Sequence, residues 1–379
     1  MIRQDVNRPH VVWLEGVLDY FNAPFPHDAQ DPRKIGFGVG QQIIGLYLIE
    51  QLLQYALVKA DVSYDRNHNL RDMFQVLPDP RRNAVERKYG RLLADGVARA
   101  WDFENSVGSF LAYLGDDPLN DSRYFWERDR GTNMSIVFFG GGALRLLVYA
   151  LFIVLHDYPE GSSLEQRYET EFDSFEDSIP DEDDPTANQN SERDGKRITV
   201  PKFWLEGVLE YFDARFPHES DDPRRLGFEL GQRVIGLYLS EMLLKYAADD
   251  LNRDYGNTHN LLNLFKKLPR PRRRAVDKQY KKILHNRVAS TWDYAASVEE
   301  HLEYLGNDPV TDVRYFWESS DKGNKAIPIS PGPLVPLVDA LLIELHGYPV
   351  SGLIEKRYDT LFLPFEASLR SSAASVTSR

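Results

Sequence analysis

The chain contains one long sequence pattern twice, about 190 residues apart. VWLEGVLDYFNAPFPH at 12–27 returns as FWLEGVLEYFDARFPH at 203–218. GQQIIGLYLIEQLLQYA from Gly40 returns as GQRVIGLYLSEMLLKYA from Gly231, so equivalent residues are 191 apart. This period is far longer than the roughly 20–50 residues of a solenoid repeat. The repeat therefore predicts the duplication of a whole domain, and we call its two halves copy one and copy two.

The repeat also predicts where the domains begin and end. We expect copy one at 1–170 and copy two at 200–365. The segment at 171–199 is acidic and has few apolar residues, so it cannot bury enough surface to fold and is predicted to be a disordered linker. Residues 366–379, which end in SSAASVTSR, are predicted to be a disordered tail.

Within each copy the apolar residues recur with a helical period, and the alternation typical of strands is nearly absent. The fold class predicted is therefore all-α, with two homologous antiparallel helical bundles. The longest helix carries apolar residues on most faces, which predicts that it is central and buried. Its glycines, Gly36, Gly38, Gly40 and Gly45, allow close helix packing. We expect helices over 11–21, 34–59, 80–97, 102–114, 141–156 and 202–212, and an irregular segment at SRYFWE, 122–127.

Composition excludes several classes of function. The chain has no cysteine, which excludes disulfides, thiolate chemistry and cysteine-ligated zinc. We find no cluster of metal ligands, no phosphate-binding loop and no nucleophile–base motif, so we predict no metal and no cofactor. No apolar run approaches the roughly 20 residues that span a bilayer, and the first residues lack the apolar core of a signal peptide. We therefore expect a soluble, cytoplasmic protein without membrane contacts.

The net charge of −13 is concentrated in the predicted linker, where ten acids and one base lie between Glu171 and Asp194. The overall charge is therefore a poor guide to partners. Copy one has a modest basic run, which we interpret as a solvated helix face: Arg81, Arg82, Arg87, Lys88 and Arg91.

The basic run of copy two is denser and contains one acid, Asp277: Lys266, Lys267, Arg270, Arg272, Arg273, Arg274, Lys278, Lys281 and Lys282. Such a stripe would bind phosphates in a salt-dependent way. The alternative is a solvated face, which could dock the chain's own acidic linker.

The longest helix and the loop after it resemble the core of the HEPN domain family. Copy one reads GLYLIEQLLQYALVKADVSYDRNHNLRDMF from Gly45, and copy two reads GLYLSEMLLKYAADDLNRDYGNTHNLLNLF from Gly236. In the family, an acidic residue lies in a helix that ends in a Leu-Leu-Lys type run, and a loop then leads to a His-Asx-Leu helix start. The dipeptides at Arg123 and Arg314 resemble the family's Arg-Tyr-Pro segment, although Phe follows the Tyr here.

The resemblance implies bundles of four or five helices that act in pairs, here by intramolecular pairing of the two copies. Many members of the family are metal-independent ribonucleases of defence, toxin–antitoxin or RNA-processing systems, and others are inactive, nucleotide-binding or scaffolding versions. Active members carry an Arg followed by a His four to six residues later. Arg253 and His259 fit this spacing, while copy one has Val62 and His68 at the equivalent positions. The resemblance therefore makes Arg253, His259 and His68 the catalytic candidates, although the motif lies in a loop here and on a helix in active members.

Two carboxylates are predicted to be buried, because Glu50 and Glu241 lie on apolar stripes of their helices. A buried carboxylate needs a partner that offsets its desolvation. The candidate partners are His68 and Arg123 in copy one, and His259 and Arg314 in copy two. Each pair is either architectural or a tuned group in a cleft, and the two arginines could alternatively grip a phosphate.

The resemblance thus implies a tandem HEPN-like, RNA-associated protein, which is either a metal-independent endoribonuclease or an inactive relative. The alternative is a non-catalytic interaction module that binds a protein partner or a nucleotide. The two readings differ in whether Arg253 and His259 face a shared basic groove.

Overall fold

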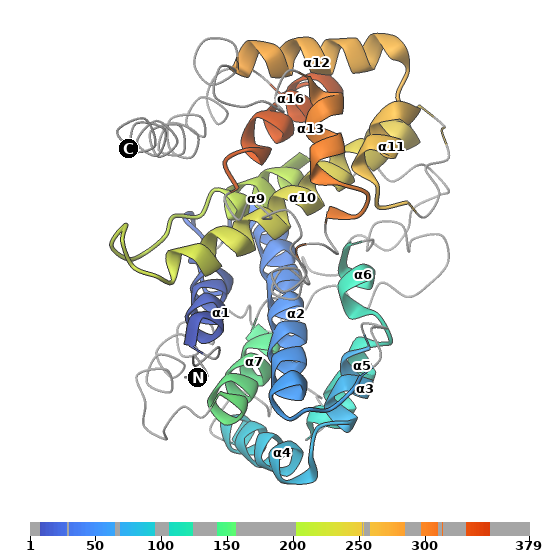
Figure 1. Cartoon of the computed structure of the whole chain (residues 1–379). Helices are drawn as coiled ribbons and strands as arrows, with labels where there is room; N and C mark the ends of the chain where they lie inside the picture. The colour runs from blue at the N-terminus through green and yellow to red at the C-terminus, as the bar shows by residue number, and fades with distance from the viewer. Residues whose placement is uncertain are drawn as a thin grey trace, which may run out of the picture. The chain divides into compact units, whose positions relative to one another are not determined.

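A computed structural model describes residues 8–28, 30–64, 69–94, 106–123, 142–156, 202–251, 253, 258–284, 297–309, 313 and 331–348. Every regular element within these ranges is an α-helix (Figure 1), which confirms the all-α prediction. The predicted linker at 171–199 and the predicted tail at 366–379 lie outside the described residues.

The chain divides into two compact units, Met1–Tyr211 and Phe212–Arg379. Unit 1 contains α1 (Arg8–Phe21), α2 (Arg33–Lys59), α3 (Leu70–Gln75), α4 (Asp79–Ala94), α5 (Val107–Leu114), α6 (Pro118–Arg123), α7 (Gly142–Leu155) and α9 (Lys202–Phe212) up to Tyr211. Unit 2 contains α10 (Arg225–Asp250), α11 (Leu261–Lys267), α12 (Arg270–Leu284), α13 (Val298–Leu305) and α16 (Leu334–His346). The division falls within α9, whereas the sequence boundaries assign this helix to copy two.

The long helices α2 and α10 organise their units. In unit 1, α2 packs against α1, α3, α6 and α7, and α4 packs against α7. In unit 2, α10 packs against α11 and α16, and α12 packs against α16 and α13. Both long helices bury most of their residues, as their apolar pattern predicted.

Local capping chemistry sets the starts of α5 and α6, of which the first was predicted too early and the second was not predicted. The helix expected from 102 begins at Val107, because the Ser106 side chain accepts a hydrogen bond from the backbone N–H of Ser109 and so caps it. The segment expected to be irregular from 122 begins inside α6, which starts at Pro118. Proline is well placed there, since the first residue of a helix needs no N–H partner.

Helix α9 contacts α1 through a reciprocal pair of tyrosines. The Tyr20 hydroxyl donates to the Tyr211 carbonyl over 2.8 Å, and the Tyr211 hydroxyl donates to the Tyr20 carbonyl over 2.9 Å. Their rings stack with centroids 4.5 Å apart, and burial raises the pKa of Tyr211 well above its usual value. Because the two tyrosines are equivalent in the repeat, each helix presents the same group to the other, as in an isologous interface.

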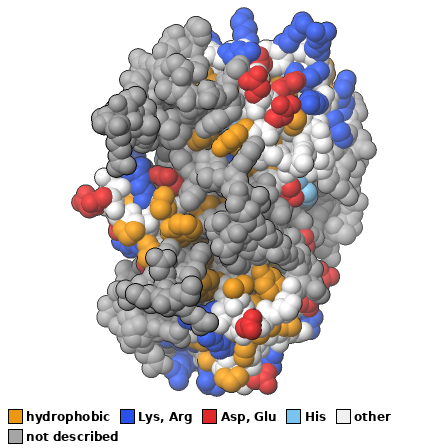
Figure 2. Space-filling view, viewed as in Figure 1, with side chains coloured by type: hydrophobic (Ala, Val, Ile, Leu, Met, Phe, Trp, Pro, Cys, Tyr) orange, Lys and Arg blue, Asp and Glu red, His pale blue; other side chains and the backbone are white. Residues whose placement is uncertain are grey.

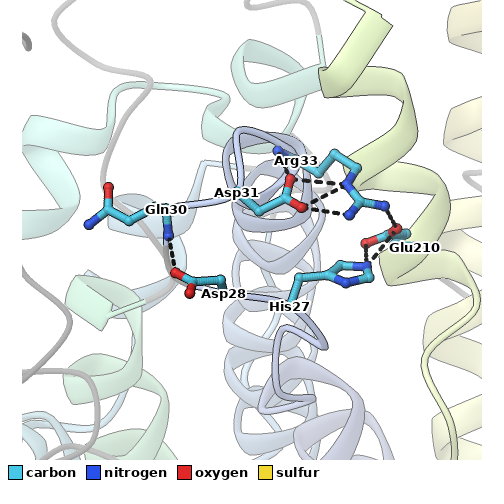
Figure 3. Close-up of polar contacts among 6 residues, drawn as sticks. All are labelled: His27, Asp28, Gln30, Asp31, Arg33 and Glu210. Atoms are coloured by element: carbon cyan, nitrogen blue, oxygen red, sulfur yellow. Dashed lines mark hydrogen bonds and ion pairs between the residues drawn. The ribbon is translucent and has the colours of Figure 1, made fainter.

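A buried carboxylate on α9 forms a second anchor (Figure 3). The Glu210 carboxylate contacts an Arg33 guanidinium nitrogen, and its Oε1 lies 2.9 Å from Nε2 of His27. Arg33 also binds both oxygens of Asp31, and this side-chain hydrogen bond lowers the pKa of Asp31 to about 2. Since each charge has an opposite partner, we interpret this cluster as the anchor of α9 on unit 1.

His301 is expected to make unit 2 sensitive to acid. Its Nδ1 lies 3.0 Å from the Tyr280 hydroxyl, and complete burial, together with repulsion from Arg233, lowers its pKa to about 3. The unfolded chain, with a pKa of about 6.5, therefore binds a proton that the folded chain excludes between these two values. The free energy of unfolding should fall as the pH drops below about 6.5, by about 1.4 kcal/mol per pH unit, or on the order of 2 kcal/mol at pH 5.

The variant His301→Phe tests this prediction, because Phe110 occupies the equivalent buried position in copy one. Urea-induced unfolding at pH 7 and pH 5 should show a clearly smaller loss of stability in the variant. An equal pH dependence in both proteins would show that His301 is not the group that titrates.

Candidate functional site

A buried ion pair lies on the inner face of α10. Glu241 is 2% exposed, and Nζ of Lys245, one helical turn later, lies 3.1 Å from its Oε1. The Lys245 side chain is itself 3% exposed. The charge of the carboxylate is therefore balanced within the protein, as a buried ion requires.

His259 lies against the same carboxylate. Its Nδ1 is 3.1 Å from Oε1 of Glu241, and its side chain is 29% exposed, so the ring reaches solvent while one nitrogen contacts a buried acid. The ring is positioned by the start of α11, where the Asn260 side chain accepts from the Asn263 N–H. In the tautomer that carries its proton on Nδ1, this N–H donates to Glu241, and Nε2 is then the nitrogen with the free lone pair. This orientation suits acid–base chemistry.

Copy one has a related but different arrangement. Glu50 is 1% exposed and accepts a hydrogen bond of 3.0 Å from Nε2 of Gln54, the equivalent of Lys245. Both glutamates are thus buried, as their positions on apolar stripes predicted. His68 lies outside the described residues. Lys245 was not among the predicted site residues, although its spacing of four residues from Glu241 is the usual one for a helical ion pair.

Arg253 makes a contact of a different kind. Its Nη1 donates over 2.8 Å to the carbonyl of Lys267, in the last turn of α11, while its backbone N–H donates to Ala248. His259 precedes the first turn of the same helix, which has seven residues and a length of about 10 Å. Arg253 therefore contacts the last turn of α11, whereas His259 lies just before the first turn, and the joint catalytic role of these two residues stays a prediction. Nothing is described of the Arg123 side chain or of Arg314.

Helix α12 has one buried face and one exposed, basic face. Val276, Gln279, Tyr280 and Leu284 are buried. Seven of the nine basic residues predicted to bind nucleic acid are exposed, while Lys267 and Arg273 are half-buried. In Figure 2, Lys and Arg side chains gather at the edge of the view where Figure 1 places α12.

Several of these basic residues have structural partners. Arg272 donates over 3.2 Å to the Glu344 carbonyl, Arg273 lies 3.0 Å from Glu299, and Lys281 lies 2.7 Å from Asp277. The contacts of Arg272 and Arg273 tie α12 to α16 and α13, whereas the Lys281–Asp277 pair lies within α12. Lys278 and Lys282, by contrast, are exposed and form no ion pair with another described residue.

The equivalent face of copy one is less basic. Residues 75–91 carry five basic residues and two acids, whereas residues 266–282 carry nine and one. Arg82 is held by Asp79 at 2.5 Å and by the Gln75 carbonyl, and Lys88 is buried. Of the five basic residues interpreted as a solvated face, only Arg87 and Arg91 are exposed, so the solvated part of the copy-one run is limited to these two.

Neither a metal centre nor a membrane span is found in the described part of the chain. No group of three or more His, Asp or Glu side chains there could hold a metal ion. No described helix combines the length and apolar character that crossing a membrane requires. A search of protein-family models, of curated proteins and of solved structures gives no match to this chain.

Proposed function

We propose that the chain is an RNA-associated protein built from two HEPN-like domains that arose by duplication, and that copy two supplies the RNA-binding surface. The observation that carries this proposal is the exposed basic face of α12 and the end of α11. Exposed Lys and Arg side chains along one helix neutralise phosphates without reading base sequence, and each contact releases a counterion.

A ribonuclease activity would use His259. The Glu241 carboxylate orients the ring, and the partly exposed imidazole could accept or donate a proton at a ribose 2′-hydroxyl. This chemistry needs no metal ion.

The alternative, a non-catalytic module that binds a protein or a nucleotide, is favoured by two contacts. Lys245 balances the charge of Glu241, and Arg253 binds a backbone carbonyl. Glu241 and Arg253, the two residues that would act with His259, therefore both have architectural roles. Cleavage therefore has to be tested separately from binding.

Truncation of Lys278 and Lys282 to alanine is expected to weaken RNA binding. Both side chains lie on the exposed face, one helical turn apart, and α12 is not held by them. Loss of two phosphate contacts should lower the slope of log affinity against log salt by about 1.4 for single-stranded RNA, or roughly 20-fold in affinity at 0.1 M salt. Fluorescence anisotropy with a labelled single-stranded RNA over a salt series measures both quantities. Arg272 and Arg273 are poorer probes, because their structural contacts would mix stability with binding.

The matched control is Arg87→Ala with Arg91→Ala, the equivalent exposed positions of copy one. This control should leave the affinity and the salt slope nearly unchanged. Equal effects of both double variants, or no RNA affinity even at low salt, would replace this proposal by the interaction module.

The nuclease version is tested on the same RNA without metal ions. If the wild-type protein cleaves it, His259→Ala should abolish cleavage and retain binding, as removal of an acid–base group should. Retained cleavage in this variant would exclude His259 as the catalytic group.

A further inference from the structure

A cavity of about 280 Å³ lies where α11, α12 and the start of α13 meet. Three arginines of α12 line it: Arg270, Arg273 and Arg274. Phe265, which is 1% exposed, contributes an apolar part of the wall. Asp277 and Glu299 also line the cavity, so two negative charges lie beside the three guanidinium groups.

Both acids are already satisfied by neighbouring groups. One Asp277 oxygen accepts the Val298 N–H at the start of α13 over 3.0 Å, and the other lies 2.7 Å from Nζ of Lys281. Glu299 lies 3.0 Å from Nη1 of Arg273. These contacts neutralise the two carboxylates.

The arginines retain unused capacity to donate hydrogen bonds. Arg270 and Arg274 are exposed and form no ion pair with another described residue. Nε of Arg273 is buried without a hydrogen-bond partner in the described structure. The cavity therefore combines two uncompensated guanidinium groups with a third that has an unsatisfied donor.

In copy one, the equivalent carboxylate makes the same kind of contact with the start of α5, but the surrounding residues carry the opposite charge. Glu86 replaces Asp277 and accepts the N–H groups of Val107 and Gly108, over 2.9 and 3.2 Å. At the positions of Arg270 and Arg274, copy one has Asp79 and Asn83, and Asp79 binds Arg82. The excess positive charge is thus a property of copy two. Because α5 of copy one begins without it, the start of α13 does not need this charge for its own stability.

We infer that this cavity binds a phosphate monoester, either of a free mononucleotide or at the end of an RNA strand. Guanidinium groups present paired N–H donors that match phosphate oxygens, and a monoester carries up to two negative charges. The volume exceeds what a phosphate needs, which leaves space for part of the attached nucleoside. The RNA-end version rests on the proposed function, whereas the mononucleotide version does not require RNA binding.

The test compares single-stranded RNA oligonucleotides of one sequence that carry a 5′-phosphate, a 3′-phosphate or hydroxyls at both ends, alongside adenosine 5′-monophosphate and adenosine. The wild-type protein should prefer a phosphorylated probe over its hydroxyl counterpart by about tenfold or more, since hydrogen bonds to charged groups contribute at least that factor. Isothermal titration calorimetry measures each affinity.

Arg270→Ala with Arg274→Ala should abolish this preference, so that phosphorylated and hydroxyl probes bind with about equal affinity. Lys278→Ala with Lys282→Ala is the matched control, because it also removes two positive charges from the exposed face of α12 but none from the cavity lining. It should weaken RNA binding while leaving the ratio between phosphorylated and hydroxyl probes unchanged. A second variant, Arg270→Asp with Arg274→Asn, introduces the copy-one residues, which the chain already accommodates at the equivalent positions, and should also abolish the preference.

The outcomes separate this inference from the proposed function. Preference for the monophosphate over adenosine without RNA binding supports the cavity and rejects RNA association. Binding of hydroxyl RNA with no preference for any phosphorylated probe rejects the cavity and leaves RNA association intact. A preference that survives both cavity variants also overturns the assignment.

Discussion

Substitution of Gly36 by alanine is expected to destabilise the packing of α9 on unit 1 by about 3 kcal/mol. An added Cβ at Gly36 would lie 2.0 Å from the Trp204 carbonyl oxygen and within 3 Å of two further backbone atoms of Trp204. Backbone atoms cannot rotate aside as a side chain can, so the two helices would have to separate. Overpacking commonly costs about 1–3 kcal/mol, and a clash with backbone belongs at the upper end.

The same helix provides the control. A Cβ at Gly38 would have nothing within 4 Å, so Gly38→Ala should increase stability by up to about 1 kcal/mol through helix propensity. Gly207 meets α2 from the other side, 2.0 Å from the Arg33 carbonyl oxygen, so Gly207→Ala should resemble Gly36→Ala. Their double variant should cost less than the sum, because both changes disrupt one crossing. Urea-induced unfolding measures all four, and similar effects at Gly36 and Gly38 would contradict this account.

These glycines show how far the sequence could predict the fold. The apolar pattern predicted correctly that α2 is a long, buried helix, and its glycines indicated close packing. The apolar pattern could not distinguish Gly36, which lies against the backbone of α9, from Gly38, where an added Cβ would have no atom within 4 Å. Periodicity reports that a face is buried, but the partner of that face depends on long-range contacts that leave no local signal.

The tyrosine pair and Arg253 illustrate two other limits. Tyr20 and Tyr211 are recognisable as equivalent residues, yet only the packed structure shows that each binds the other's carbonyl. Arg253 has the spacing of a catalytic motif, but its guanidinium donates to the carbonyl of Lys267. Sequence spacing alone does not fix which group a side chain contacts. The start of α5 was predicted at 102 but lies at Val107, although its cap at Ser106 is a local signal in the sequence.

Replacement of Lys245 by methionine is expected to be the most destabilising change at the candidate site, at about 3–5 kcal/mol. Glu241 and Lys245 are both almost completely buried, and their charges balance each other at 3.1 Å. Methionine fills a similar volume but leaves the carboxylate without its ammonium partner. The desolvation of the carboxylate is then no longer offset to the same extent.

Two matched variants separate the loss of charge balance from the loss of packing. Lys245→Gln reproduces the copy-one pair, in which Gln54 donates to Glu50 over 3.0 Å, so it should cost clearly less than Lys245→Met. Adding Glu241→Gln to Lys245→Met removes the carboxylate charge and should recover much of the lost stability. Urea-induced unfolding at pH 7 compares them, and equal losses for the methionine and glutamine variants would mean that packing rather than charge dominates. Glu241 also contacts His259. If the wild-type protein cleaves RNA, a double variant that is stable and binds RNA without cleaving it would assign the carboxylate a role in positioning the imidazole.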